Sequence, residues 1–135
     1  MGTRILDTEV LIRHYNEMTL SKSVQSVKEH AQQLIKLEET HWILSPIKIE
    51  FLCGARDSNE FNLFSAYLEV FEVLDARNIP PQDWREAQRL AQWSKETRRP
   101  RKPGDCLIQA IAKRRHAGVI TRDLDYRART PPKKT

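Results

Sequence analysis

The sequence contains only two cysteines, Cys53 and Cys106, in 135 residues. Neither belongs to a Cys-x-x-Cys motif or to a Cys/His pattern with the spacing of a metal site. This scarcity argues against a disulfide framework and against a cysteine-ligated metal centre. We expect both residues to be reduced thiols in the core or at its boundary, as is usual in a cytosolic protein.

Long apolar runs are also lacking. No run approaches the roughly 18 apolar residues of a membrane span, and the N-terminus has no basic and then apolar leader. We see no internal repeat at a fixed period. These observations lead us to expect a cytoplasmic protein without membrane contact.

The composition is that of a folded domain, with 39% hydrophobic and 30% charged residues. A length of 135 residues suits one domain. We expect that domain to span residues 1–126, followed by a basic, proline-containing tail at 127–135. The 23 Lys and Arg against 18 Asp and Glu leave a net charge of +5, which weakly favours a polyanionic partner.

Apolar periodicity predicts alternating strands and helices. The expected strands are 3–7, 41–44, 70–74 and 119–121. The expected helices begin near residues 10, 23, 45, 57, 80 and 105. Ser45 is the predicted cap of the third helix, with Pro46 in its first turn. Pro103-Gly104 is expected to break the chain before the helix that Asp105 begins. Strands that alternate with helices imply a parallel sheet covered on both faces.

One expectation concerns the inward face of the helix that Pro80-Pro81 opens. Helical spacing places Trp84, Ala87, Leu90 and Ala91 on one stripe, which we expect to be buried.

Four acids lie near strand ends or helix starts: Asp7, Glu50, Asp105 and Asp123. Asp7 and Asp123 each follow a strand, beside the polar neighbours Thr8 and Thr121. In a parallel sheet these groups converge on the carboxyl edge, where ligands bind. Clustered carboxylates repel unless a cation is present, and oxygen ligands suit Mg²⁺ or Mn²⁺.

Each acid also has an ordinary explanation. Asp7 could be a helix cap, Glu50 could face solvent, Asp105 could be a first-turn acid favoured by the helix dipole, and Asp123 could be a turn residue. Asp125 remains a rival for the fourth position.

The segments that carry these acids resemble those of PIN-domain ribonucleases. They are Ile5-Leu6-Asp7-Thr8, residues 45–54, residues 103–112 and residues 119–126, and their order and spacing match over about residues 3–126. Within that family, the sequence is most similar to VapC toxins of prokaryotic toxin–antitoxin pairs.

The resemblance implies a three-layer α/β/α sandwich and a Mg²⁺- or Mn²⁺-dependent endoribonuclease. It implies that Asp7, Glu50, Asp105 and Asp123 are the catalytic, metal-binding acids, supported by Thr8 and Thr121. A homodimer inhibited by a small VapB-type antitoxin is also implied. We expect residues of the basic loop and of the fourth strand's end to hold the RNA backbone; they are Arg98, Arg99, Arg101, Lys102 and Arg122. A solvated helix end is an equally ordinary explanation for the loop.

Two departures from the family pattern are visible. Many relatives have Asn at the position of Glu9, which we expect to face solvent. Few residues follow the fourth acid, and Pro131-Pro132 lies among them, so we expect the last edge strand to be short or missing. A non-catalytic PIN-like RNA-binding module is the alternative function, although all four acids are present. A haloacid-dehalogenase-type enzyme would need Asp at position 9.

Overall fold

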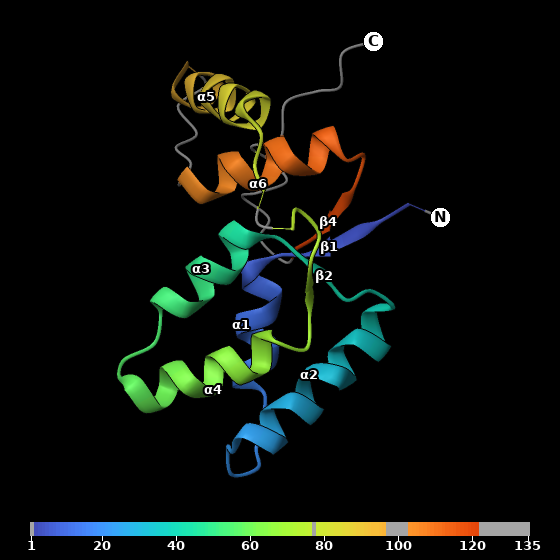
Figure 1. Cartoon of the computed structure of the whole chain (residues 1–135), viewed down its shortest axis with the longest axis vertical. Coiled ribbons are helices and arrows are strands. Elements are labelled where there is room, and N and C mark those ends of the chain that lie inside the picture. The colour runs from blue at the N-terminus through green and yellow to red at the C-terminus, as the bar shows by residue number, and fades with distance from the viewer. Residues whose placement is uncertain (1, 77, 97–102, 122–135) are drawn as a thin grey trace.

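In the computed structural model, the described residues are 2–76, 78–96 and 103–121, and they form short strands and helices (Figure 1). The strands are β1 (Arg4–Leu6), β2 (Trp42–Ile43), β3 (Glu72–Val73) and β4 (Gly118–Ile120). The helices are α1 (Thr8–Asn16), α2 (Val24–Glu38), α3 (Ser45–Cys53), α4 (Ser58–Leu68), α5 (Pro81–Glu96) and α6 (Pro103–Arg114). None of these helices combines the length and the apolar character needed to cross a membrane.

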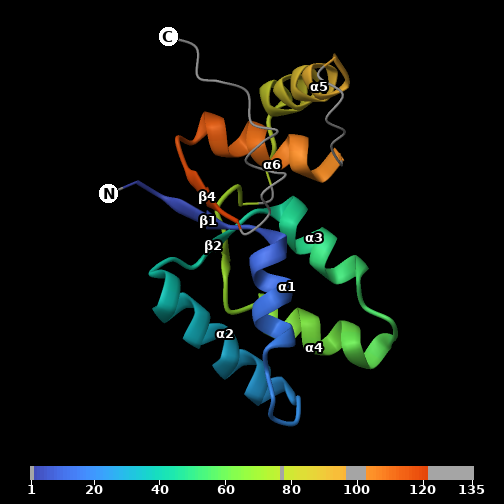
Figure 2. The ribbon, with the colours of Figure 1, turned by 180° about the vertical axis from the view of Figure 1, so that it is seen from behind.

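The described strands form one parallel sheet in the order β3-β2-β1-β4. Because parallel crossovers are right-handed, connections that run in one direction place their helices on one face. The chain moves from β1 to β2 to β3 and then returns past β1 to reach β4. Accordingly, α1 to α4 lie on one side of the sheet, and α5 and α6 lie on the other (Figure 1 and Figure 2). The predicted α/β/α sandwich is confirmed.

The strand order makes the end of β1 the natural ligand position. β1 pairs with β2 on one side and with β4 on the other, with Leu6 opposite Ile120. The helices that follow β1 lie on one face of the sheet, whereas the helices that precede β4 lie on the other, so the strand order reverses beside β1 (Figure 1). In open parallel sheets, ligands bind outside the carboxyl ends of the strands at such a switch point.

The core lies on both faces of β1 and β2, where Ile5, Leu6 and Ile43 are fully buried. Below the sheet, four rings from α1, α3 and α4 form an aromatic cluster with centroid separations from 4.8 to 5.9 Å. Its members are Tyr15, Phe51, Phe64 and Tyr67. Edge-to-face and offset contacts of this kind add to the stabilisation from burial. The cluster thereby fixes α3 against its neighbours.

The predicted inward face of α5 is wrong for Trp84, whose side chain is 52% exposed, and for Ala91. Leu90 is buried against α6, whereas the buried residue beside Trp84 is Asp83. Arg114 of α6 donates from Nε to both carboxylate oxygens of Asp83, at 2.8 and 2.9 Å. This ion pair rotates the first turn of α5 so that Trp84 faces outward.

The predicted start of α3 is also corrected. Leu44 occupies the cap position and supplies no side-chain hydrogen bond, while Ser45 and Pro46 are already helical. The acceptor for the Ser45 backbone N–H is instead Oδ1 of Asp75, at 3.1 Å. Asp75 lies two residues after the end of β3 and is fully buried. A buried acid from a neighbouring strand thus replaces the local cap.

Two smaller expectations need adjustment. Cys106 is buried as expected, but Cys53 is exposed at the end of α3. Pro103 and Gly104 do not break the chain before Asp105, because α6 already begins at Pro103. Proline suits that first position, where its missing N–H has no intrahelical partner in any case.

Two stacked histidines, His14 of α1 and His30 of α2, predict that the fold is sensitive to acid. The rings of His14 and His30 lie 3.7 Å apart, and His14 Nδ1 is 2.7 Å from the Tyr67 hydroxyl. Burial, and then the positive charge of His30, lower the pKa of His14 to about 4. The unfolded chain therefore binds more protons between pH 6.5 and 4, so stability falls as pH falls through this window.

We expect this group to remove about 1 kcal/mol between pH 7 and 5, after allowance for solvent screening of a half-buried site. Urea unfolding at both pH values measures the loss. His14→Gln should flatten the dependence, whereas the exposed His116→Gln should leave it unchanged. An equal slope for wild type and His14→Gln would assign the acid sensitivity to other groups.

Candidate active site

Asp7 occupies the switch point at the carboxyl end of β1. Its side chain is 5% exposed, and its backbone N–H donates to the Ile120 carbonyl at 3.0 Å. Oδ1 accepts from the Thr8 N–H at 2.8 Å, so Asp7 caps α1. Oδ2 accepts from the Thr121 hydroxyl at 2.9 Å, which links the ends of β1 and β4. The cap interpretation is correct, but it leaves one oxygen directed across the sheet edge.

Glu50 approaches this edge from α3. The Thr8 hydroxyl lies 3.4 Å from Glu50 Oε2, a long hydrogen bond in which the hydroxyl donates. Glu50 itself is half-buried, between the exposed Ile49 and the buried Phe51. Because Phe51 is locked in the aromatic cluster, the helix presents Glu50 to the sheet edge rather than to open solvent.

The first turn of α6 closes the site from the other side. A Cβ atom at Gly104 would lie 3.2 Å from Oε2 of Glu50. That separation is slightly tighter than normal packing, so a larger residue at position 104 would require the Glu50 carboxylate to move by a few tenths of an ångström. Asp105 follows in the same turn and is half-buried. The unpaired N–H groups of a helix start carry positive potential, which reduces the repulsion between neighbouring acids.

The structure therefore brings together Asp7, Thr8, Glu50 and Thr121, with the turn that carries Asp105 against Glu50. Glu9 is exposed, as predicted. The predicted acids Asp123 and Asp125 lie outside the described residues. So do the basic residues predicted to contact RNA: Arg98, Arg99, Arg101, Lys102 and Arg122.

The donor chemistry of this edge fits a hard divalent cation, because every polar side chain here offers oxygen. Gly104 also leaves space in front of the Glu50 carboxylate. Within residues 2–76, 78–96 and 103–121, however, no three Asp, Glu, His or Cys side chains are grouped closely enough to hold a metal ion. The side chains of these described residues do not by themselves form a metal site.

Sequence reasoning missed two residues near this edge. Asp75 follows β3 as Asp7 follows β1, so the same signal of an acid after an apolar strand was present in Val73-Leu74-Asp75. Lys48 lies with Glu50 and Trp84 in the lining of a cavity of about 820 Å³ beside the acids. Helical spacing alone could not indicate this cavity, because α3, α5 and α6 each contribute a wall.

The fold and these acids define an α/β domain with a carboxylate site at the switch point of a parallel sheet. The sequence profile of the PIN domain family matches residues 4–130, nearly the whole chain. The chain therefore belongs to the PIN domain family. PIN domains are generally nucleases, so this is a domain of the kind that hydrolyses nucleic acid. Comparison with curated proteins gives no significant match.

Proposed function

We propose that this protein is a metal-dependent endoribonuclease, and that it is the VapC-type toxin of a type II toxin–antitoxin pair. The observation that supports this most directly is the buried Asp7 carboxylate, held by Thr121 and facing the edge that Glu50 and α6 approach. A structural cap needs only one carboxylate oxygen. The second oxygen is directed toward the candidate active site. The nearby acids and the space left by Gly104 suit a bound metal ion there.

In this proposal, Asp7, Glu50, Asp105 and Asp123 hold Mg²⁺ or Mn²⁺. The ion would supply the positive charge that stabilises a phosphodiester during its cleavage. The Thr121 hydroxyl orients Asp7, and the Thr8 hydroxyl makes a longer hydrogen bond to Glu50. Such fixed ligands reduce the reorganisation needed when charge develops.

The partly exposed Glu50 is the carboxylate best placed to accept a proton from an attacking water. The water oxygen forms a bond to phosphorus as the bond to the leaving oxygen breaks, and that oxygen then takes up a proton. Asp7 is less suited to this role, because its side chain is almost fully buried.

The remaining elements of the proposal concern partners. The net charge of +5 favours RNA, and we assign backbone contacts to Arg98, Arg99, Arg101, Lys102 and Arg122. We further propose a cytoplasmic homodimer, silenced by an antitoxin that places a cationic side chain near Asp7 and Asp105. A cation at that point would replace the charge of the metal.

Metal-dependent stabilisation tests the site without requiring the correct RNA. At about ten times Kd, Mn²⁺ should add about 1.4 kcal/mol to the free energy of unfolding, which raises the melting temperature by a few degrees. The Asp7→Asn/Asp105→Asn double variant should show little shift. Equal shifts for both proteins would mean that the ion binds elsewhere.

Cleavage itself is measured with structured RNAs in Mg²⁺, Mn²⁺ or EDTA, using protein free of antitoxin. Internal cuts that EDTA suppresses support the endoribonuclease. Tight RNA binding without cleavage under every metal condition would favour the alternative, a non-catalytic RNA-binding module.

A further inference from the structure

The cavity beside the acids is bounded by three helices. It has a volume of about 820 Å³ and is lined mainly by apolar side chains of α3, α5 and α6. Glu50 and Gly104, which form part of the candidate active site, also line the cavity. A molecule in the cavity is therefore adjacent to whatever occupies the acid site. This volume is typical of pockets for small ligands or single nucleotides.

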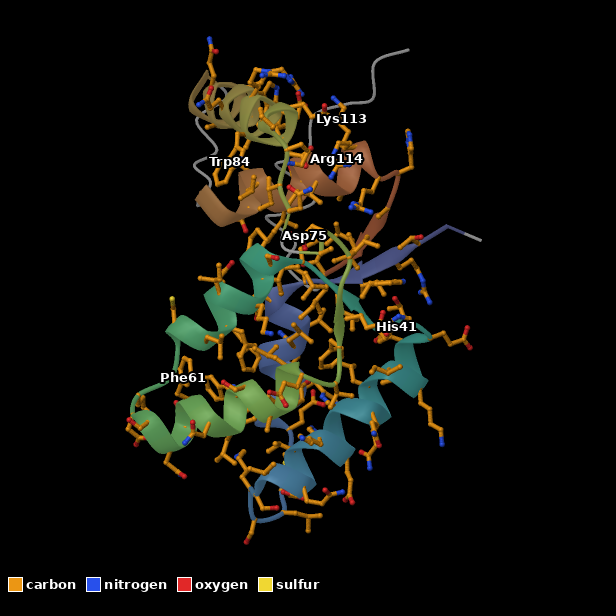
Figure 3. All side chains as sticks on the ribbon, in the orientation of Figure 1. His41, Phe61, Asp75, Trp84, Lys113 and Arg114 are labelled. Atoms are coloured by element: carbon orange, nitrogen blue, oxygen red, sulfur yellow. The ribbon has the colours of Figure 1, made fainter. Side chains whose placement is uncertain are left out.

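Trp84 supplies an exposed aromatic wall of this cavity. Its side chain is 52% exposed, and Ile49 across the cavity is 61% exposed. Figure 3 shows Trp84 at the start of α5, next to the first turn of α6. Exposed single apolar residues are ordinary. Two large exposed apolar residues that line one cavity beside the candidate active site suggest a binding surface.

The backbone under Trp84 is held firmly. Asp83 is 1% exposed and receives both Arg114 hydrogen bonds. One turn later, Glu86 accepts from Arg89 and from Lys113 of α6, and these bonds lower the pKa of Glu86 to about 2. The labelled Arg114 and Lys113 lie between the two helices in Figure 3. The helix turn that carries Trp84 is thus held against α6.

The chemistry of the lining favours a nucleobase. An indole face and the apolar Ile49 and Leu107 suit a flat aromatic group, whereas Lys48 offers a cation to a backbone phosphate. Proteins that bind single-stranded RNA combine these two features, because every base has a face that can stack. Because Glu50 and Trp84 line the same cavity, a nucleotide whose phosphate lies at the acids can direct its base into that cavity.

We infer that this cavity, with Trp84 as its platform, binds one unpaired base of RNA next to the scissile phosphate. This inference rests on the proposed nuclease function and adds a base-binding subsite to it. The site favours a base that is already unpaired, because a base inside a duplex must first lose its stacking and pairing before it can reach Trp84.

The test compares Trp84→Ala, Trp84→Phe and the control Phe61→Ala. Phe61 is also an exposed aromatic residue, at 46%, but it lies in the first turn of α4, away from Trp84 (Figure 3). The substrate is an end-labelled single-stranded RNA whose cleavage position is mapped first. A second RNA carries an abasic nucleotide on one side of the cut, and a third carries it on the other side.

Trp84→Ala should raise KM for the intact RNA about tenfold, the factor that corresponds to about 1.4 kcal/mol of lost stacking. The kcat should change little, since the acids are untouched. Trp84→Phe should retain most of the affinity, and Phe61→Ala should match the wild type. For one of the abasic RNAs, wild type and Trp84→Ala should have equal, raised KM values, since the stacking partner is already absent.

Each other result contradicts the inference in a distinguishable way. Equal KM values for all variants on intact RNA would contradict the base site but not the nuclease. The same would follow if Trp84→Ala raised KM by the same factor on the intact RNA and on both abasic RNAs. A wild-type protein that neither cleaves nor binds the RNA removes the proposed function and this inference with it. Sedimentation that shows Trp84→Ala converting a dimer to a monomer, with KM unchanged, assigns the cavity to a second copy of the chain.

Discussion

Asp7→Asn should lower RNA cleavage by at least about 10²- to 10³-fold, the scale of losing one preorganised electrostatic group in an active site. Asparagine keeps the shape of the side chain and can still accept a hydrogen bond at the start of α1. It removes the negative charge at the carboxyl end of β1. The expected loss is therefore one of chemistry rather than of folding.

The matched control is Asp57→Asn. Asp57 caps α4 as Asp7 caps α1, with Oδ1 accepting from the Glu60 N–H at 2.8 Å. It lies on an exposed loop, so its substitution makes the same chemical change away from the sheet edge. Because Asn and Asp are comparable caps, both variants should unfold within about 1 kcal/mol of wild type in urea. Undiminished cleavage by Asp7→Asn would place the activity in another site or in a contaminant.

Phe51→Ala should have the largest effect on stability, about 3–5 kcal/mol of the free energy of unfolding. Phe51 is 2% exposed, and its ring packs against Tyr15, Phe64 and Tyr67 at 5.9, 4.8 and 5.6 Å. Truncation leaves a cavity that three aromatic rings from two other helices cannot readily fill. In a domain of this size, we expect the melting temperature to fall by more than about 10 °C.

Phe61→Ala again provides the control, because Phe61 is 46% exposed and lies outside the aromatic cluster. Its substitution should cost less than about 1 kcal/mol. Chemical unfolding of both variants measures the difference. A Phe51→Ala protein as stable as Phe61→Ala would show that the cluster adapts to the loss, and that the position of α3 depends on other contacts.

Much of the fold could be predicted from the sequence, because strand and helix periods alternate in an order that permits few topologies. Asp7 was predictable for the same reason, since an acid directly after a short apolar strand must lie at the sheet edge. Glu50 was less determined: its two neighbours in sequence are apolar, and only the burial of Phe51 decides which way the helix faces. The resemblance to PIN domains supplied what periodicity could not.

The failures have a common physical cause. Trp84 and Ala91 fit an apolar stripe, but the ion pair between Asp83 and Arg114 joins residues 31 positions apart and outweighs that pattern. Ser45 is a good cap residue, yet a buried carboxylate from β3 takes the cap's role. Contacts between distant segments decided both cases, and a local pattern contains no information about them.

The hydrogen bond from Ser45 to Asp75 joins the sheet's edge strand to the helix that carries Glu50. Local unfolding in proteins proceeds in cooperative units. Detachment of β3 from β2 would disturb the acceptor at the start of α3, less than two turns from Glu50. We therefore expect β3 and the start of α3 to unfold together, so that opening of the sheet edge also loosens the helix that carries Glu50.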